Sequence, residues 1–187
     1  MESKLQLYNR VLSTRDELSE EFVRGACDSI QRKILLMEEF RLATRIGLYS
    51  SFGSEVRTDL LFKEGDKNRK ELYYPTFTPE GAGAAYYRTM NLGELEPGMH
   101  GKLEPTDKQS KLRDVSYLNA LIVPGVVFDL KGGRIGFGKG FYDSCLAEFS
   151  GDRIALAYDF QVVSQLPVAV AGKKVDWIVT EERIIRC

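Results

Sequence analysis

The residues best suited to chemistry stand in a glycine-rich segment, at positions 132–143. Two cations, Arg134 and Lys139, lie among glycines that have no side chain to keep a ligand away from the peptide N–H groups. These glycines are Gly132, Gly133, Gly136, Gly138 and Gly140. The first pair allows a turn with positive φ, and the alternating three leave backbone donors open. Cations and open donors in one loop predict a phosphate site, most simply for the polyphosphate of a nucleotide.

A helix is predicted to follow this loop, because apolar side chains recur at helical spacing. They are Phe141, Cys145, Leu146 and Phe149. A helix N-terminus adds unpaired donors and partial positive charge, and Asp143 in the first turn could reach a bound magnesium ion. The glycine spacing matches neither G-x-x-x-x-G-K-[ST] nor G-x-G-x-x-G. A tight hairpin followed by a helix cap therefore stays open as the alternative.

A second candidate site follows a short strand predicted at 46–49. A loop of small residues, 50–54, comes next. Ser54 is predicted to cap a helix that starts at Glu55 and runs through Phe62. Open α/β folds place ligands at such strand-to-helix junctions, which makes Glu55 a candidate ligand-binding acid. The alternative for Glu55 is a first-turn acid favoured by the helix dipole.

Strands and helices alternate along the chain. A buried strand is predicted from Leu121 towards Asp129, directly before the glycine loop. Further strands are predicted at 72–75, 85–90, 154–158 and 177–180, with an edge strand at 184–185. Amphipathic helices are predicted at 3–17 and from the N-cap Ser19 onwards. This order indicates a three-layer α/β/α sandwich, Rossmann-like, with a mostly parallel or mixed sheet.

Composition restricts the partners. The 187 residues are 43% apolar, enough for a single domain, 1–187, with a sizeable core. A net charge of −1 creates no global field for nucleic acid or an anionic membrane, and no apolar run approaches the length of a membrane span. Three cysteines without a C-x-x-C pair and a single histidine, His100, argue against a zinc site, a disulfide framework and a Ser-His-Asp triad. We expect a monomer that acts on a small molecule in the cytoplasm.

The segment 124–143 reads P-G-V-V-F-D-x-x-G-G-R-I-G-F-G-K-G-F-Y-D. It closely resembles the signature of the 5-formyltetrahydrofolate cyclo-ligase family, also called methenyltetrahydrofolate synthetase. Glu55-Val56-x-Thr58 is similar to a family motif, and 95–105 resembles the family's L-x-x-G-x-x-G-I-x-E-P. The resemblance implies a NagB/RpiA/CoA-transferase-like fold. It also implies a ligase of one-carbon folate metabolism that converts 5-formyltetrahydrofolate (folinate) to 5,10-methenyltetrahydrofolate and turns ATP into ADP and phosphate.

The resemblance implies roles for individual residues. Arg134 and Lys139 would serve the transferring phosphate, and Asp143 would bind Mg²⁺. Glu55 would bind the pterin, because a carboxylate accepts the adjacent 2-amino and ring N–H donors. The substrate-binding residues would be Glu55, Ser50, Phe141 and Glu104. The ATP-binding residues would be Lys4, Arg134, Ile135, Gly136, Phe137, Gly138, Lys139, Gly140, Phe141 and Tyr142.

The residue types leave alternatives at several of these positions. A lysine near a chain terminus, such as Lys4, is most often a solvated side chain, and Glu104 is equally a surface acid in a loop. Phe141 or Tyr142 could stack on a flat ring, but an aromatic side chain after a glycine loop is otherwise a core residue.

Two positions depart from the family's pattern. Tyr8 stands in place of an arginine thought to reach ATP phosphates, and Arg10 could substitute for it. Gly172 stands in place of an aspartate that helps to hold magnesium, so the metal would depend on Asp143, ATP oxygens and waters. Asp176 could partly replace that aspartate, or it is a structural acid. The alternative functions are a catalytically weakened family member that acts through a partner and an unrelated nucleotide-binding α/β enzyme.

Overall fold

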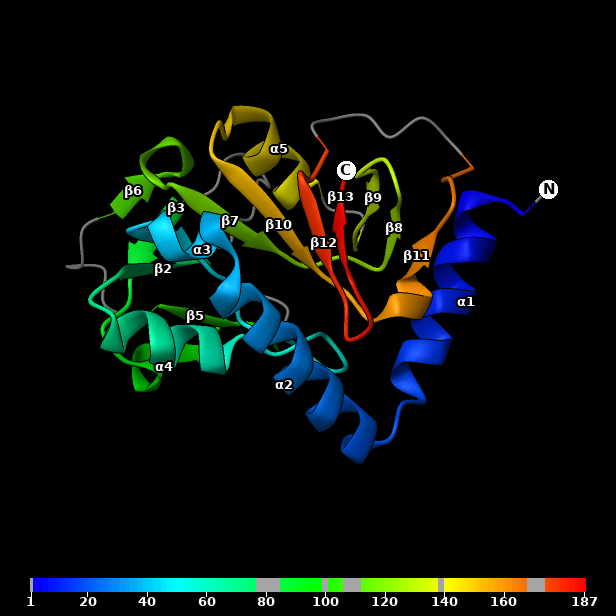
Figure 1. Ribbon diagram of the computed structural model, residues 1–187, viewed down its shortest axis with the longest axis horizontal. Coiled ribbons are helices and arrows are strands. Elements are labelled where there is room, and N and C mark those ends of the chain that lie inside the picture. Colours follow the sequence, from blue (N-terminus) through cyan, green and yellow to red (C-terminus); the bar gives the residue numbers. More distant parts are fainter. Residues whose placement is uncertain (1, 77–84, 99–100, 106–111, 138–139, 168–173) are drawn as a thin grey trace.

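The structure is a computed structural model that describes residues 2–76, 85–98, 101–105, 112–137, 140–167 and 174–187. Four positions named above, His100, Gly138, Lys139 and Gly172, lie outside these residues. An eight-stranded sheet forms the centre, in the order β13-β12-β10-β7-β1-β2-β3-β6 (Figure 1). The strands are β1 Arg45–Gly47, β2 Glu71–Thr76, β3 Ala85–Arg88, β6 Leu112–Asp114, β7 Ala120–Val123, β10 Asp152–Leu156, β12 Trp177–Val179 and β13 Ile184–Arg186.

The middle of this sheet is parallel and its edges are antiparallel. Strands β12, β10, β7, β1 and β2 pair in parallel, whereas β13 at one edge and β3 and β6 at the other pair antiparallel. Every residue of β7 is buried, as a strand covered on both faces requires. The mixed α/β fold predicted from the sequence is confirmed.

Helices cover both faces of the sheet. They are α1 Lys4–Asp16, α2 Glu20–Leu36, α3 Glu38–Leu42, α4 Asp59–Lys67 and α5 Phe141–Glu148, with short 3-10 turns at Leu92–Glu94, Val115–Tyr117 and Asp159–Gln161. Figure 1 shows α2, α3 and α4 together on one side of the strands. The connection through α4 moves from β1 to β2, and the connection through α5 moves the other way, from β7 to β10. Because such crossovers are right-handed, α4 and α5 lie on opposite faces.

Two small sheets flank the large one. Strands β11 (Val162–Val163), β8 (Val127–Asp129) and β9 (Arg134–Ile135) form the first, and β4 (Leu95–Pro97) and β5 (Leu103–Pro105) form the second. Helix α1 packs on β8 and lies apart from the other helices (Figure 1). A separate apolar cluster joins them, comprising Leu7, Val11, Val126, Val127, Ile135 and Leu166. Among the described residues no helix is both long and apolar enough to cross a membrane.

The predicted boundaries hold at the N-terminus, where α1 matches the expected helix and Ser19 caps α2 by accepting from the Phe22 N–H at 3.2 Å. The single strand predicted from Leu121 towards Asp129 is wrong. It divides into β7 and β8, which belong to different sheets. Pro124 lacks an N–H for the ladder, and the Phe128 ring packs against Gly125 so closely that a Cβ there would clash, so the chain leaves the sheet at this pair.

The helix predicted to begin at Glu55 is also wrong. Helix α4 begins at Asp59 with Thr58 as its N-cap. Glu55 lies before it in a turn, where the Glu55 N–H donates to the Phe52 carbonyl at 3.2 Å. The hydroxyl of Ser54 does not cap a helix, because it donates to Asp16 and accepts from Arg15. Tertiary contacts with α1 therefore override the local capping preference.

Candidate active site

The site lies where the strand order reverses. Strands β1 and β7 are parallel neighbours, and the chain leaves β1 towards one edge of the sheet and β7 towards the other. Ligands of open α/β sheets bind outside the carboxyl ends of strands at such a switch point. The loop after β1 holds Ser50, Ser54 and Glu55, and the segment after β7 holds Pro124 and Gly125. The two candidate sites of the sequence thus meet at one place.

Glu55 is a buried carboxylate with one oxygen satisfied. Its side chain is 2% exposed, and its Oε2 accepts from the Phe52 N–H at 3.0 Å. Its Oε1 is buried and has no hydrogen-bond partner among the described residues. The Lys102 ammonium lies 4.0 Å from this oxygen. Burial raises the pKa of Glu55, and the charges of Lys102 and Arg15 and the Phe52 N–H partly offset that rise.

Arg15 joins three segments at the switch point. It is 2% exposed, and its Nε donates to Ser54 Oγ at 3.0 Å while Nη1 donates to the Gly125 carbonyl at 3.3 Å. Its guanidinium also lies 5.5 Å from the centroid of the Phe137 ring. A residue near the end of α1 therefore connects the loops that follow β1 and β7. Arg15 was not predicted as a site residue, although it stands four and eight positions after Val11 and Leu7 on the buried face of α1.

Arg134 is held inside the glycine loop. It is 6% exposed, its Nη1 donates to the Pro124 carbonyl at 3.2 Å, and its Nη2 donates to Asp143 Oδ1 at 2.5 Å. The guanidinium lies 5.6 Å from the centroid of the Tyr142 ring. A Cβ on Gly136 would collide with Arg134 Nη1. The absence of a side chain at Gly136 thus makes room for Arg134. The sequence pattern had predicted room for a ligand at this glycine.

Asp143 lies in the first turn of α5 with a side chain that is 49% exposed. Its Oδ1 is paired with Arg134, so Oδ2 is the oxygen open to a cation. The described part of the chain contains no group of three or more His, Cys, Asp or Glu side chains that could hold a metal. One carboxylate fits magnesium, which commonly keeps several waters and binds substrate phosphates. The metal role of Asp143 stays a prediction.

The turn before Arg134 is built around Asp129. This carboxylate is buried and accepts from the N–H groups of Lys131 at 3.0 Å, Gly133 at 2.8 Å and Leu166 at 3.2 Å. Gly132 has a φ of +79°, a conformation that favours glycine. A Cβ on Gly133 would approach the Asp129 carboxylate to 2.9 Å. These two glycines serve the turn, as predicted for the first pair in the loop.

Within the glycine-rich segment 132–143, two aromatic residues are buried and one is not. Phe141 and Tyr142 are 8% and 7% exposed, and their ring centroids lie 5.0 Å apart in a T-shaped arrangement. Burial and the Glu55 carboxylate raise the pKa of Tyr142, which places its phenol in the field of Glu55. Phe137 is 45% exposed, with the Tyr8 ring edge-on at 6.4 Å. Phe137 is therefore the ring of this loop that a ligand can reach from solvent.

The remaining predicted residues lie at the margin or outside. Lys4 is exposed at the first residue of α1, and Ser50 is half-buried after Tyr49. Glu104 pairs with Glu96 across the hairpin β4–β5, and a Cβ on Gly98 would lie 2.5 Å from its carboxylate. Gly140, the N-cap of α5, has a φ of +71°.

Neither substitute that the sequence offered for a missing family residue lies at the switch point. Arg10 is exposed and paired with Glu2 at 2.9 Å. Asp176 precedes β12 at the amino end of the parallel strands, where it accepts from the Arg153 N–H at 2.9 Å. Its carboxylate, at the end of the sheet opposite the switch point, therefore forms structural contacts with Arg153, and a role towards a metal stays a prediction.

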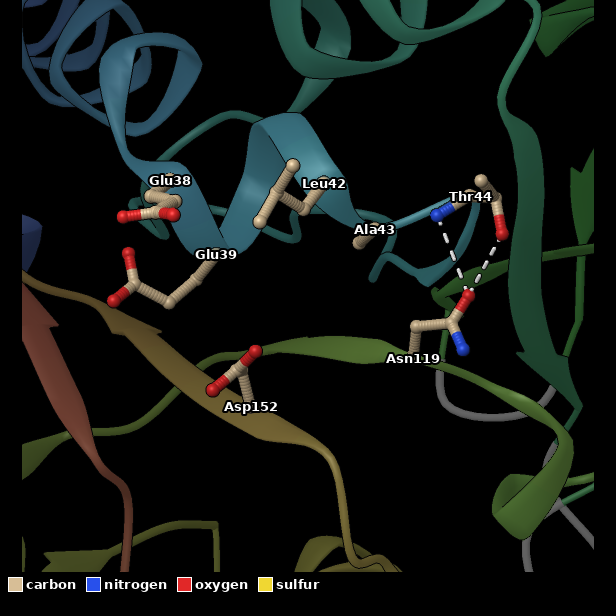
Figure 2. A pocket seen from close by; sticks show the side chains of 7 residues that line it. All are labelled: Glu38, Glu39, Leu42, Ala43, Thr44, Asn119 and Asp152. Carbon is tan, nitrogen blue, oxygen red and sulfur yellow. Dashed lines mark hydrogen bonds between the residues drawn. The ribbon is translucent and has the colours of Figure 1, made fainter.

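A pocket of about 510 Å³ also lies at this opposite end, before β1, β7 and β10 (Figure 2). Its lining residues are Glu38, Glu39, Leu42, Ala43, Thr44, Asn119 and Asp152. Asn119 Oδ1 accepts from the N–H and hydroxyl of Thr44 at 3.3 and 2.9 Å. Three carboxylates repel anions, so this pocket does not suit a nucleotide or a folate.

Comparison with known proteins identifies the family. The chain matches the model of the 5-formyltetrahydrofolate cyclo-ligase family over residues 1–181. It belongs to this family. The cyclo-ligase of Haemophilus influenzae is 28% identical over 170 residues, which cover 89% of this chain and 91% of the relative. A probable cyclo-ligase of Caenorhabditis elegans is 24% identical over 196 residues, covering 98% and 95%.

Solved structures of the same family share the fold. The 5,10-methenyltetrahydrofolate synthetase of Aquifex aeolicus is 34% identical and superimposes with a TM-score of 0.87, covering 98% of this chain and 92% of the relative. The synthetase of Mycoplasma pneumoniae is 20% identical with a TM-score of 0.77, covering 95% and 98%, and shows the fold alone. The family and the fold expected from the glycine loop are both confirmed.

Proposed function

We propose that this member of the family is an ATP- and Mg-dependent 5-formyltetrahydrofolate cyclo-ligase. It converts 5-formyltetrahydrofolate to 5,10-methenyltetrahydrofolate and releases ADP and phosphate. The observation that carries the proposal is the buried Glu55 carboxylate, set beside the signature loop at the switch point, with one oxygen that has no hydrogen-bond partner among the described residues. A buried carboxylate oxygen without a partner is costly unless a ligand satisfies it. The pterin edge, with two adjacent N–H donors, does so with charge-assisted bonds.

The reaction needs no nucleophilic side chain. The formyl oxygen attacks the γ-phosphorus of ATP, and the bond from phosphorus to the ADP oxygen breaks. The N10 nitrogen then attacks the formyl carbon and loses its proton, and the carbon–oxygen bond breaks with release of phosphate. The protein must align the substrate oxygen with the phosphate and balance charge.

The signature loop supplies the ATP side of this site. Arg134 and Lys139 serve the transferring phosphate, and the ATP contacts extend over 134–142 and to Lys4. Arg134 is pre-positioned by the Pro124 carbonyl and Asp143, which lowers the entropic cost of ordering its guanidinium. A bound magnesium ion would neutralise phosphate charge, and Asp143 Oδ2 is the atom that would hold it. Ser50, Glu104 and Phe141 complete the folate side with Glu55.

The chain is expected to act on its own, as a single domain and a monomer, in the cytoplasm. Its three cysteines, Cys27, Cys145 and Cys187, are free thiols, which suits a reducing compartment. No nucleic-acid partner is expected, because the net charge is −1.

The experiment mixes the purified chain with 5-formyltetrahydrofolate, ATP and Mg²⁺ and follows the near-ultraviolet absorbance of the methenyl product. Product that requires all three components supports the proposal. Lys139→Ala should lower kcat by about 100-fold or more at an unchanged Tm, because a phosphate-binding cation is lost. A variant that unfolds but keeps its activity per folded molecule would show that the loop is structural.

A second candidate function is a catalytically weakened member that binds folate or nucleotide and acts through a partner. Two observations favour it: Tyr8 packs on Phe137 in place of an arginine, and an oxygen of Asp143 is already paired with Arg134. Tight folate binding without product would support this function. Binding of ATP without any folate would instead support an unrelated nucleotide-binding enzyme.

A further inference from the structure

The charged groups of Lys102 and Glu55 face each other but are too far apart for a direct hydrogen bond. The Lys102 Nζ lies 4.0 Å from Glu55 Oε1, beyond the hydrogen-bond range of about 2.7–3.2 Å. Glu55 Oε1 is the buried oxygen that lacks a partner among the described residues. The side chains are 17% and 2% exposed, so bulk water screens the two charges weakly. A hydrogen-bond acceptor and a donor cation are thus presented side by side in a buried site.

The walls of this site restrict what can enter it. The Lys102 ammonium also lies 5.6 Å from the centroid of the Phe137 ring, which is 45% exposed. A Cβ on Gly101 would touch the Phe52 ring at 3.2 Å, so the hairpin that carries Lys102 packs on the loop that carries Glu55. The Phe52 N–H fixes the other oxygen of Glu55. The site therefore combines an exposed aromatic ring with a carboxylate acceptor and an ammonium donor, which suits the edge of a flat ligand.

We propose that Lys102 is a specificity-determining residue that donates a hydrogen bond to the C4 carbonyl of the pterin. A pterin edge presents a 2-amino group, a ring N–H and then a carbonyl oxygen. Glu55 accepts from the two donors, and the adjacent carbonyl oxygen then falls towards the ammonium. The ligand bridges the 4.0 Å gap with two hydrogen bonds in place of one long ion pair.

This role is specific to the chemistry of the ligand edge. An N–H next to a C=O in the same ring satisfies an acceptor and a donor that stand side by side, whereas a ring with an amino group in place of the carbonyl presents a donor to an ammonium. Two donors that face each other repel and form no hydrogen bond with one another, which a buried site penalises strongly. The pair Glu55 and Lys102 thus selects a 4-oxo pterin over a 4-amino pterin.

The inference rests on the proposed function, because it assumes that Glu55 binds the pterin. The test measures Kd without ATP for two ligands, 5-formyltetrahydrofolate and its 4-amino-4-deoxy analogue, by isothermal titration calorimetry. The wild-type chain should bind the 4-oxo ligand at least about tenfold more tightly. In Lys102→Met this preference should fall by about tenfold, because the oxo ligand loses a donor and the amino ligand loses a repulsion. Lys102→Arg, which keeps a charged donor, should retain the preference.

Controls distinguish a failure of this inference from a failure of the proposed function. Lys63→Met removes a lysine that is 67% exposed and paired with Asp59 on α4, and it should leave both Kd values unchanged. If Lys102 has only a structural role, Lys102→Met should weaken the binding of both ligands equally. An unchanged ratio of the two Kd values would then overturn the inference, although folate binding itself would stand. Equal binding of both ligands by the wild type overturns it without any variant. If the wild type does not bind 5-formyltetrahydrofolate, or Glu55→Gln binds it as well as the wild type does, the proposed function itself fails.

Discussion

At the scale of single residues, Glu55 is a carboxylate that the fold buries without fully satisfying it. Within the part of the chain that the structure describes, only Oε2 accepts a backbone hydrogen bond, and Lys102 is too distant to bond directly with Oε1. Burial of a charge without close pairing lowers stability, and such groups concentrate where ligands bind. In the proposed function, the same atom that lowers the stability of the free protein would contribute binding energy for the pterin, because the ligand would supply the missing donors.

Because the buried charge of Glu55 lowers stability and is proposed to bind the pterin, Glu55→Gln should raise stability and abolish folate binding. Burial raises the pKa of Glu55 in the folded state, so folding favours the protonated acid. The free energy of unfolding of the wild type therefore decreases as pH rises and Glu55 loses its proton, whereas the variant has no such decrease. At pH 7 the variant should therefore gain about 2–4 °C in Tm, the shift that roughly 1 kcal/mol produces in a domain of this size. The gain should vanish below about pH 4, near the ordinary pKa of glutamate, as measured by calorimetry. A lower Tm for the variant at pH 7 would contradict this.

At the scale of elements, the signature loop is held by its turn and by its helix cap. Asp129 binds three backbone N–H groups, Gly132 takes a positive φ, and Gly140 takes another at the start of α5. Arg134 then packs over Gly136 and reaches the Pro124 carbonyl. The glycines of the signature therefore differ in purpose, since Gly132 and Gly140 take conformations that favour glycine and Gly136 makes room for Arg134.

The two glycines with positive φ provide a matched pair of variants. A Cβ on Gly132 would collide with the Val175 carbonyl, whereas a Cβ on Gly140 would meet open space within 4 Å. Gly140→Ala should therefore cost only the backbone penalty of about 1 kcal/mol. Gly132→Ala should cost about 2–4 kcal/mol, because a steric clash with the backbone is added. Urea unfolding measures both, and equal losses would show that the collision is relieved at no cost.

At the scale of the whole molecule, the site is assembled from segments that lie far apart in the sequence. Helix α1 rests on the small sheet and carries Arg15 to the Gly125 carbonyl after β7 and to Ser54 after β1. The hairpin of β4 and β5 brings Lys102 to the same place from the other side. The topological reversal between β1 and β7 is what opens the position that all of these elements surround.

Arg15→Met tests this assembly through the pH dependence of folate binding. The charge of Arg15 lowers the pKa of Glu55, so its removal should raise that pKa further and move the acid limb of binding to higher pH. Stability should also fall by about 1–3 kcal/mol, because Ser54 and the Gly125 carbonyl lose a buried donor. Measurement of Kd for 5-formyltetrahydrofolate between pH 5 and 8 checks the shift. If binding by the variant weakens at the same acidic pH as binding by the wild type, Arg15 has only a structural role.

The sequence by itself determined the α/β class, because apolar periodicity is a local property of the chain, and it determined the family through the resemblance of its signature segment. The phosphate role of the glycine loop stays a prediction. Only the tertiary structure decided that Glu55 lies in a turn, that β7 and β8 part at Pro124, and that Arg134 is anchored inside its loop. It also decided that Arg15 bonds to Ser54, the neighbour of Glu55, and that Lys102 faces Glu55, since those contacts link residues that no local pattern relates. Burial and pairing depend on which segments meet in space, and that is settled by the packing of the whole chain.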